Sequence, residues 1–171
     1  MSRNADHLSM PERIDLSEND DDNARRLLSE YGEDLLYVGG KNWAVWDGLR
    51  YSFEGGELAA FEVGSKLRAL VDAEADFAAT EWEPPEWRLR RMCFDEPRKY
   101  STLDEAKDGL RADTAARLRK HAVKCGNVAK IKAALESLAH RRRAVVEDLD
   151  RDPFQFICAN GQVDLLMARK F

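Results

Sequence analysis

The spacing of apolar and polar positions divides the chain into helical and strand-like stretches. Residues 1–17 contain few apolar side chains and are predicted to form a flexible tail. Acids and cap-forming residues gather at residues 17–22, where a helix N-terminus favours both. Apolar residues then recur every three or four positions as far as Tyr31, and Gly32 follows where a C-terminal cap belongs. The pattern predicts a helix from about Asp21 to Tyr31.

Three short runs rich in aromatic and β-branched residues follow this helix. They span residues 35–38, 43–46 and 50–53, and turn-forming Gly, Asn and Asp residues separate them. This order predicts a three-stranded antiparallel meander. Because so small a sheet must cover one face, we expect a helix from about residue 57 to 75 to pack on it. Prolines interrupt residues 76–100: Trp82, Pro84, Pro85 and Trp87 favour a loop, Pro97 prevents a continuous helix, and the pattern assigns no helix or strand to this stretch.

The next stretch predicts two consecutive helices. Thr102 and Glu105 match a capping box, and apolar positions at helical spacing continue from there to Gly126. Asn127 is suited to cap a second helix, which carries its own apolar stripe. Residues 101–143 are therefore predicted to form a helical hairpin.

The complete pattern predicts an α+β fold: a small three-stranded antiparallel meander backed by helices, followed by a basic helical hairpin and a C-terminal β-hairpin. Strand-like runs on either side of Asn160-Gly161 predict that β-hairpin within residues 149–171. We expect one domain over residues 18–171, with the first helix, the meander and its covering helix in residues 18–76.

Charge is unevenly distributed along the 171 residues, which carry a net charge of -5. Residues 1–110 hold 14 Lys and Arg against 25 Asp and Glu, whereas residues 111–143 hold 10 against 2. If the two helices pack antiparallel, the triplet Arg141-Arg142-Arg143 approaches the start of the first helix, and the basic side chains cover a long strip. Such a strip suits the phosphates of a nucleic-acid backbone. The alternative to nucleic-acid binding is that these basic side chains form a solvated helical face, or that they pair with acids of the first 110 residues.

The candidate nucleic-acid-binding residues are Arg117, Lys120, Lys124, Lys130, Lys132, Arg141, Arg142 and Arg143. On the first helix they fall at spacings of three and four, away from the apolar face. Aromatic residues of the meander could stack on bases, but alternation along the strands favours packing in the core. These aromatic residues are Trp43, Trp46, Tyr51 and Phe53.

Other chemistry is weakly represented. Neither a phosphate-binding glycine loop nor a nucleophile elbow is present, so no catalytic residue is assigned. His121 and Cys125 lie four residues apart on a helix, but no second ligand pair accompanies them, and no metal is expected. The acids at residues 20–22 suit a helix start, and those at residues 147–150 suit a solvated helix end. No apolar run is long enough to span a membrane, and three widely spaced cysteines suit a reducing cytoplasm.

Several motifs in order resemble a known family. They are Asn23-Ala24-Arg25-Arg26-Leu27, Trp43-x-x-Trp46-Asp47-Gly48, Asp152-Pro153-Phe154 and Asn160-Gly161-x-Val163-Asp164-Leu165. Together they are similar to phage and plasmid primase-helicases, in the region N-terminal to the superfamily-III helicase, and to the poxvirus primase-helicase domain that flanks its helicase. The resemblance covers about residues 19–165. Tyr51 stands where many relatives have Trp, and Cys158-Ala159 replaces a commoner Leu-Asn.

The resemblance implies a non-catalytic region of a phage or prophage replication protein that binds single-stranded or forked DNA or helps to assemble a helicase. It implies a homo-oligomer, hexameric in a full-length helicase, in the bacterial cytoplasm. ATP and magnesium are expected only in a helicase module whose motifs this chain lacks. The alternative is a small prophage-encoded enzyme, such as a metal-dependent nuclease that uses one of the acidic clusters.

Overall fold

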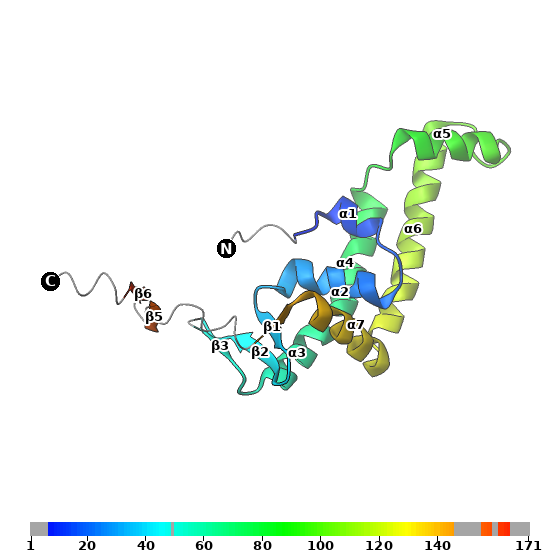
Figure 1. The fold of residues 1–171 in the computed structure, drawn as a ribbon. Coiled ribbons are helices and arrows are strands. Elements are labelled where there is room, and N and C mark those ends of the chain that lie inside the picture. The colour runs from blue at the N-terminus through cyan, green and yellow to red at the C-terminus, as the bar shows by residue number, and fades with distance from the viewer. Residues whose placement is uncertain (1–6, 49, 146–154, 159–160, 165–171) are drawn as a thin grey trace.

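The computed structural model describes residues 7–48, 50–145, 155–158 and 161–164, and the side chains as far as residue 145 (Figure 1). The fold is α+β, as predicted, and mainly helical. The helices are α1 (Met10–Ile14), α2 (Asp20–Tyr31), α3 (Gly56–Ser65), α4 (Leu67–Thr80), α5 (Glu86–Asp95), α6 (Leu103–Cys125) and α7 (Val128–Arg141). The strands are β1 (Leu35–Val38), β2 (Asn42–Trp46), β3 (Tyr51–Ser52), β4 (Arg143–Ala144), β5 (Gln155–Cys158) and β6 (Gly161–Asp164).

The helices build the main hydrophobic core. α6 packs along α4, α2 packs against α7, and α3 contacts both α7 and strand β2 (Figure 1). Leu27, Leu67 and Leu118 from three of these helices are fully buried, as is Leu138 from α7. Among the described residues, no helix combines the length and the apolar character needed to cross a lipid bilayer.

The predicted meander is confirmed, and a fourth strand extends it. The strand order is β3-β2-β1-β4, in which β1, β2 and β3 pair antiparallel and β4 pairs parallel to β1. β4 forms because the chain leaves α7 beside β1, where the amide of Tyr37 donates to the carbonyl of Arg142 at 3.0 Å. A two-residue strand has no hydrophobic period, so the pattern did not predict it. Strand β3 is also shorter than the predicted residues 50–53.

The helix predicted over residues 57–75 is two helices, α3 and α4, which meet at Lys66. Close packing at the start of α3 requires glycine, because a Cβ on Gly56 would lie 2.1 Å from the carbonyl oxygen of Trp43. Residues 76–100, to which the pattern assigned no helix or strand, contain the end of α4 and all of α5, which begins directly after Pro85. α5 lies across the N-terminal end of α6 (Figure 1) and shares a small separate core with it.

Part of the predicted flexible tail is folded. Ser9 and Glu12 form a capping box at the start of α1, and Ile14 is only 2% exposed. Leu16 is buried as well, and Arg13 pairs with Glu30 of α2. One turn of helix with only two apolar residues, Met10 and Ile14, gives too weak a periodic signal for prediction, yet it docks on a core that α2 and α4 supply.

The two helices predicted over residues 101–143 are present, with the predicted capping box of Thr102 and Glu105 and the predicted cap at Asn127. They do not pack along each other as the hairpin predicted, because α6 follows α4 whereas α7 lies against α2 and α3 (Figure 1). The prediction that the arginine triplet approaches the start of α6 is therefore wrong. The triplet lies beside α2 and β1 instead.

The C-terminal β-hairpin forms a separate two-stranded sheet. β5 and β6 pair antiparallel, with Phe156 opposite Val163. The strands differ slightly from the predicted ones, because Gly161, predicted as a turn residue, already belongs to β6. The remainder of the predicted unit over residues 149–171, including Asn160, lies outside the described residues.

Candidate nucleic-acid interface

Two of the predicted basic residues on α6 face the acid that precedes α2. Nη1 of Arg117 lies 3.5 Å from the carboxylate of Glu18, and Nζ of Lys124 lies 3.8 Å from it. Arg117 also donates to the carbonyl of Ile14 at 3.3 Å. These contacts hold the segment between α1 and α2 against α6. The two cations therefore act within the fold, as the alternative of pairing with the acidic half of the chain requires.

The basic residues of α7 contact the acidic start of α2 in the same way. Nζ of Lys130 lies 3.1 Å from Asp20, and Nη2 of Arg141 lies 2.6 Å from Asp21. Arg142 is the C-cap residue of α7, and its Nε donates to the carbonyl of Leu35 at 3.4 Å. The charge of the basic segment is thus partly neutralised by the acids that a helix N-terminus already favours.

Asp22, the third acid of the cluster, is also engaged. Its carboxylate accepts hydrogen bonds from the amide of Ser17 at 2.9 Å and from Arg25 at 3.0 Å. Burial alone would raise the pKa of Asp22, but these hydrogen bonds and the charge of Arg25 outweigh it and lower the pKa. Each acid of the cluster predicted as a helix start is therefore bound to a cation of the chain.

The other three predicted residues differ from these five. Lys120, Lys132 and Arg143 are exposed, and none has an ion-pair partner among the described residues. Lys120 lies on α6, whereas Lys132 and Arg143 both line a cavity that is described below. We refer to these three residues as the open cations.

This cavity has a volume of about 680 Å³ and lies between α3, α7 and the turn from β1 to β2. Tyr37, Trp43 and Phe61 give it an aromatic wall, in which the rings of Tyr37 and Trp43 meet edge to face with centroids 5.3 Å apart. Lys132 and Arg143 line it together with His140, Glu57, Glu136 and Asn42. We call it the α3–α7 cavity. The sequence did not reveal it, because its lining comes from segments far apart in the chain.

Of the aromatic residues of the meander, some are packed in the core and others are exposed, as stacking on bases would require. Trp43 is 8% exposed and belongs to the core, although it borders the cavity. Trp46 on β2 is 42% exposed, and Phe53, which follows β3, is 41% exposed. The ring of Trp46 meets that of Tyr51 edge to face, with centroids 5.2 Å apart. Core packing is thus confirmed for Trp43 only.

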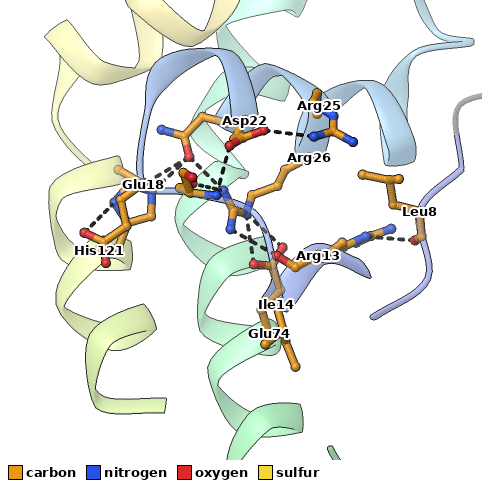
Figure 2. A network of polar contacts seen from close by, with 12 residues as sticks. Leu8, Arg13, Ile14, Glu18, Asp22, Arg25, Arg26, Glu74 and His121 are labelled. Carbon is orange, nitrogen blue, oxygen red and sulfur yellow. Dashed lines mark hydrogen bonds and ion pairs between the residues drawn. The ribbon is translucent and has the colours of Figure 1, made fainter. Parts of the chain in front are cut away.

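A buried polar network holds α1, α2, α4 and α6 together (Figure 2). Nε of Arg26 donates to both carboxylate oxygens of Glu74, at 3.1 and 2.9 Å, and both side chains are fully buried. Arg26 also donates to the carbonyls of Ser17 and Arg13, at 3.0 and 3.3 Å. Burial raises the pKa of the Glu74 carboxyl, and the charge of Arg26 opposes that rise. The sequence offered only one sign of this network: Arg26 directly precedes the core residue Leu27 in α2.

His121 and Cys125 belong to the same buried region. Nε2 of His121 lies 2.9 Å from Oδ1 of Asn23 and 3.3 Å from Sγ of Cys125. Burial and the nearby charge of Arg26 lower the pKa of His121, and burial raises the pKa of Cys125 to about 11. Over the part of the chain that the structure describes, no group of three or more His, Cys, Asp or Glu side chains could hold a metal ion.

Comparison with known proteins gives one family. Residues 24–169 match the family described as D5 N-terminal like, whose members flank the helicase of viral and phage primase-helicases. No curated protein and no solved structure matches the chain. The match covers most of the chain and agrees with the resemblance seen in the motifs. The chain belongs to the D5 N-terminal-like family, and it is a primase-helicase-associated region.

Proposed function

We propose that this chain is the non-catalytic DNA-binding and assembly region of a phage or prophage primase-helicase that acts in DNA replication. The observation that carries the DNA-binding part is the group of open cations, Lys120, Lys132 and Arg143. They are exposed and have no ion-pair partner among the described residues, whereas four other cations of the basic segment are bound to acids of the same chain: Arg117, Lys124, Lys130 and Arg141. Phosphates of a nucleic-acid backbone are the partners that such cations bind through charge, without reading bases.

The assembly part of the proposal rests on α5. Trp87 and Phe94 of this helix are 61% and 85% exposed, although both are large apolar side chains. Exposed apolar side chains of this size mark contact sites between proteins when they gather on one element. α5 lies away from the sheet and the α3–α7 cavity (Figure 1), so a contact there leaves the open cations free for DNA.

The nuclease alternative gains no support from the described residues. Asp20, Asp21 and Asp22 each contact a cation of the chain, and a catalytic metal needs carboxylates that are free to coordinate it. The second acidic cluster, at residues 147–150, lies outside the described residues.

A binding titration tests the DNA-binding proposal. Fluorescence anisotropy with labelled single-stranded, double-stranded and forked DNA is measured over a range of salt concentrations. Replacing Lys120, Lys132 and Arg143 by Gln is expected to weaken binding and to reduce the slope of log affinity against log salt by about 2 to 3, since each phosphate contact contributes about 0.7 to 0.9.

The matched control replaces three of the paired cations, Arg117, Lys124 and Lys130, by Gln. This triple variant removes the same formal charge, but these side chains are engaged with Glu18 and Asp20. We expect it to lower the free energy of unfolding and to change the salt slope less than the first triple variant. Equal slopes for the wild type and the variant that lacks the open cations would contradict the proposal.

A further inference from the structure

The α3–α7 cavity offers two kinds of surface next to each other. Its volume of about 680 Å³ lies within the range of about 300–1,000 Å³ that small-molecule sites occupy. Tyr37, Trp43 and Phe61 supply aromatic surface, and Lys132 and Arg143 supply positive charge. An aromatic wall beside cations is the combination with which proteins bind unpaired nucleotides, because every base has a face that stacks and every nucleotide carries a phosphate.

The fold fixes Arg143 at this place. Pairing of β4 with β1 sets Arg143 opposite Tyr37, and its guanidinium lies over the turn that follows β1. A Cβ added to Gly39 would lie 3.3 Å from both Nε and Nη2 of Arg143, so a glycine in the turn lets the guanidinium approach closely. Lys132 reaches the same cavity from α7. Neither cation has an acid partner among the described residues, in contrast to Lys130 and Arg141 of α7.

The cavity also contains carboxylates, which decide how a nucleotide would be oriented. Glu57 and Glu136 line it, and a carboxylate oxygen of Glu57 accepts a hydrogen bond from Nδ2 of Asn42. Carboxylates repel a phosphate but accept hydrogen bonds from the N–H groups of a base. The arrangement therefore favours the base against the aromatic wall and the phosphate on Lys132 and Arg143.

We propose that the α3–α7 cavity binds the base of one unpaired nucleotide of a nucleic-acid strand, while Lys132 and Arg143 hold an adjoining phosphate. The inference rests on the proposed DNA-binding function and adds to it a ligand class and a strand preference. A base inside a duplex is stacked and paired, and it must leave the stack to enter a cavity. The site therefore favours single-stranded over double-stranded nucleic acid.

A cavity-filling variant tests this inference. Ala139 lines the cavity from α7, and Ala139→Phe would occupy space meant for the base while leaving both cations in place. Ala129→Phe places the same side chain at an exposed position of the same helix and is the matched control. The probes are a fluorescein-labelled twelve-nucleotide oligothymidylate and a duplex of the same length, measured by anisotropy at low salt.

Ala139→Phe is expected to weaken binding of the single strand by about tenfold, the effect of losing one base stack, and to change duplex binding by less than about twofold. Ala129→Phe is expected to leave both affinities unchanged. If Ala139→Phe and Ala129→Phe bind both probes as the wild type does, the cavity inference is overturned and the proposed function stands. If the wild type binds neither probe, the proposed function fails and the cavity inference fails with it.

A second measurement keeps the inference testable if Ala139→Phe does not fold. Two-dimensional amide NMR of the wild-type chain is recorded during titration with thymidine monophosphate. Shifts are expected at Gly39, Gly40 and Ala139, around the cavity, and not on α5. Shifts confined to other parts of the chain, or none at millimolar nucleotide, would overturn the assignment of the cavity even if the chain binds DNA.

Discussion

The buried pair of Arg26 and Glu74 gives the sharpest stability prediction. Glu74→Gln keeps the size of the side chain and one oxygen that accepts from Arg26, but it removes the negative charge. The positive charge of Arg26 then stays fully buried with only neutral acceptors, among them the carbonyls of Ser17 and Arg13. Breaking a buried pair in this way costs about 3–5 kcal/mol. Because small domains are stable by about 5–15 kcal/mol, the loss is a large part of the total.

A double variant separates the charge effect from the loss of packing. Arg26→Met with Glu74→Leu removes both charges of the pair and nearly fills the same space, and such replacements are often neutral or stabilising. We expect the double variant to be more stable than Glu74→Gln alone. The same helix supplies a control in Asp76, whose pair with Arg119 at 3.1 Å is exposed, so that Asp76→Asn costs only about 0–1 kcal/mol.

Urea denaturation followed by circular dichroism measures these differences, and a constant m-value shows that the variants unfold over the same surface. A loss of stability in Glu74→Gln no greater than that in Asp76→Asn would show that burying the charge of Arg26 without a partner costs little. A double variant less stable than Glu74→Gln would contradict the prediction as well, because replacing both charged side chains by apolar ones would then cost more than leaving Arg26 buried without its partner.

Three further predictions concern single residues. Burial is the main cause that lowers the pKa of His121, so below about pH 6.5 the unfolded chain binds a proton at this side chain more readily than the folded chain does. The free energy of unfolding, measured by urea titration, should therefore fall from pH 7.5 to 5.5, and it should fall less in His121→Asn. Gly64→Ala should cost about 1–3 kcal/mol, seen as a lower melting temperature, because the new Cβ would lie 2.7 Å from Ile131. Cys125, with a pKa of about 11 and no exposure, should resist iodoacetamide at pH 7.5 until the chain unfolds, as peptide mass spectrometry would show.

Elements set by local sequence were predicted well. The strands of the meander are joined by turns whose Gly, Asn and Asp residues favour the required backbone, and the start of α6 is fixed by Thr102 and Glu105 only three residues apart. What escaped prediction depends on distant residues. β4 pairs with a strand more than a hundred residues earlier, and Arg26 meets Glu74 across 48 residues. α1 is held by contacts with α2 and α4 and not by its own periodicity.

The candidate interface shows the same division. The sequence identified the basic segment, but it could not show which of its charges are used within the fold. That depends on the path of α7, which passes the start of α2 and brings Lys130 and Arg141 to the acids there. The alternative in which basic residues pair with the acidic half is thus correct for part of the segment, whereas the open cations retain no such partner among the described residues.

This division determines how mutations of the basic segment should be interpreted. A substitution at Lys130 or Arg141 leaves Asp20 or Asp21 without a contact that joins α2 to α7, so weaker DNA binding in such a variant can follow from a looser fold. A substitution at Lys132 removes no described ion pair, and any loss of binding then reports on the ligand itself. Binding and unfolding measured together on both kinds of variant therefore separate the charges that stabilise this domain from those free to hold a phosphate.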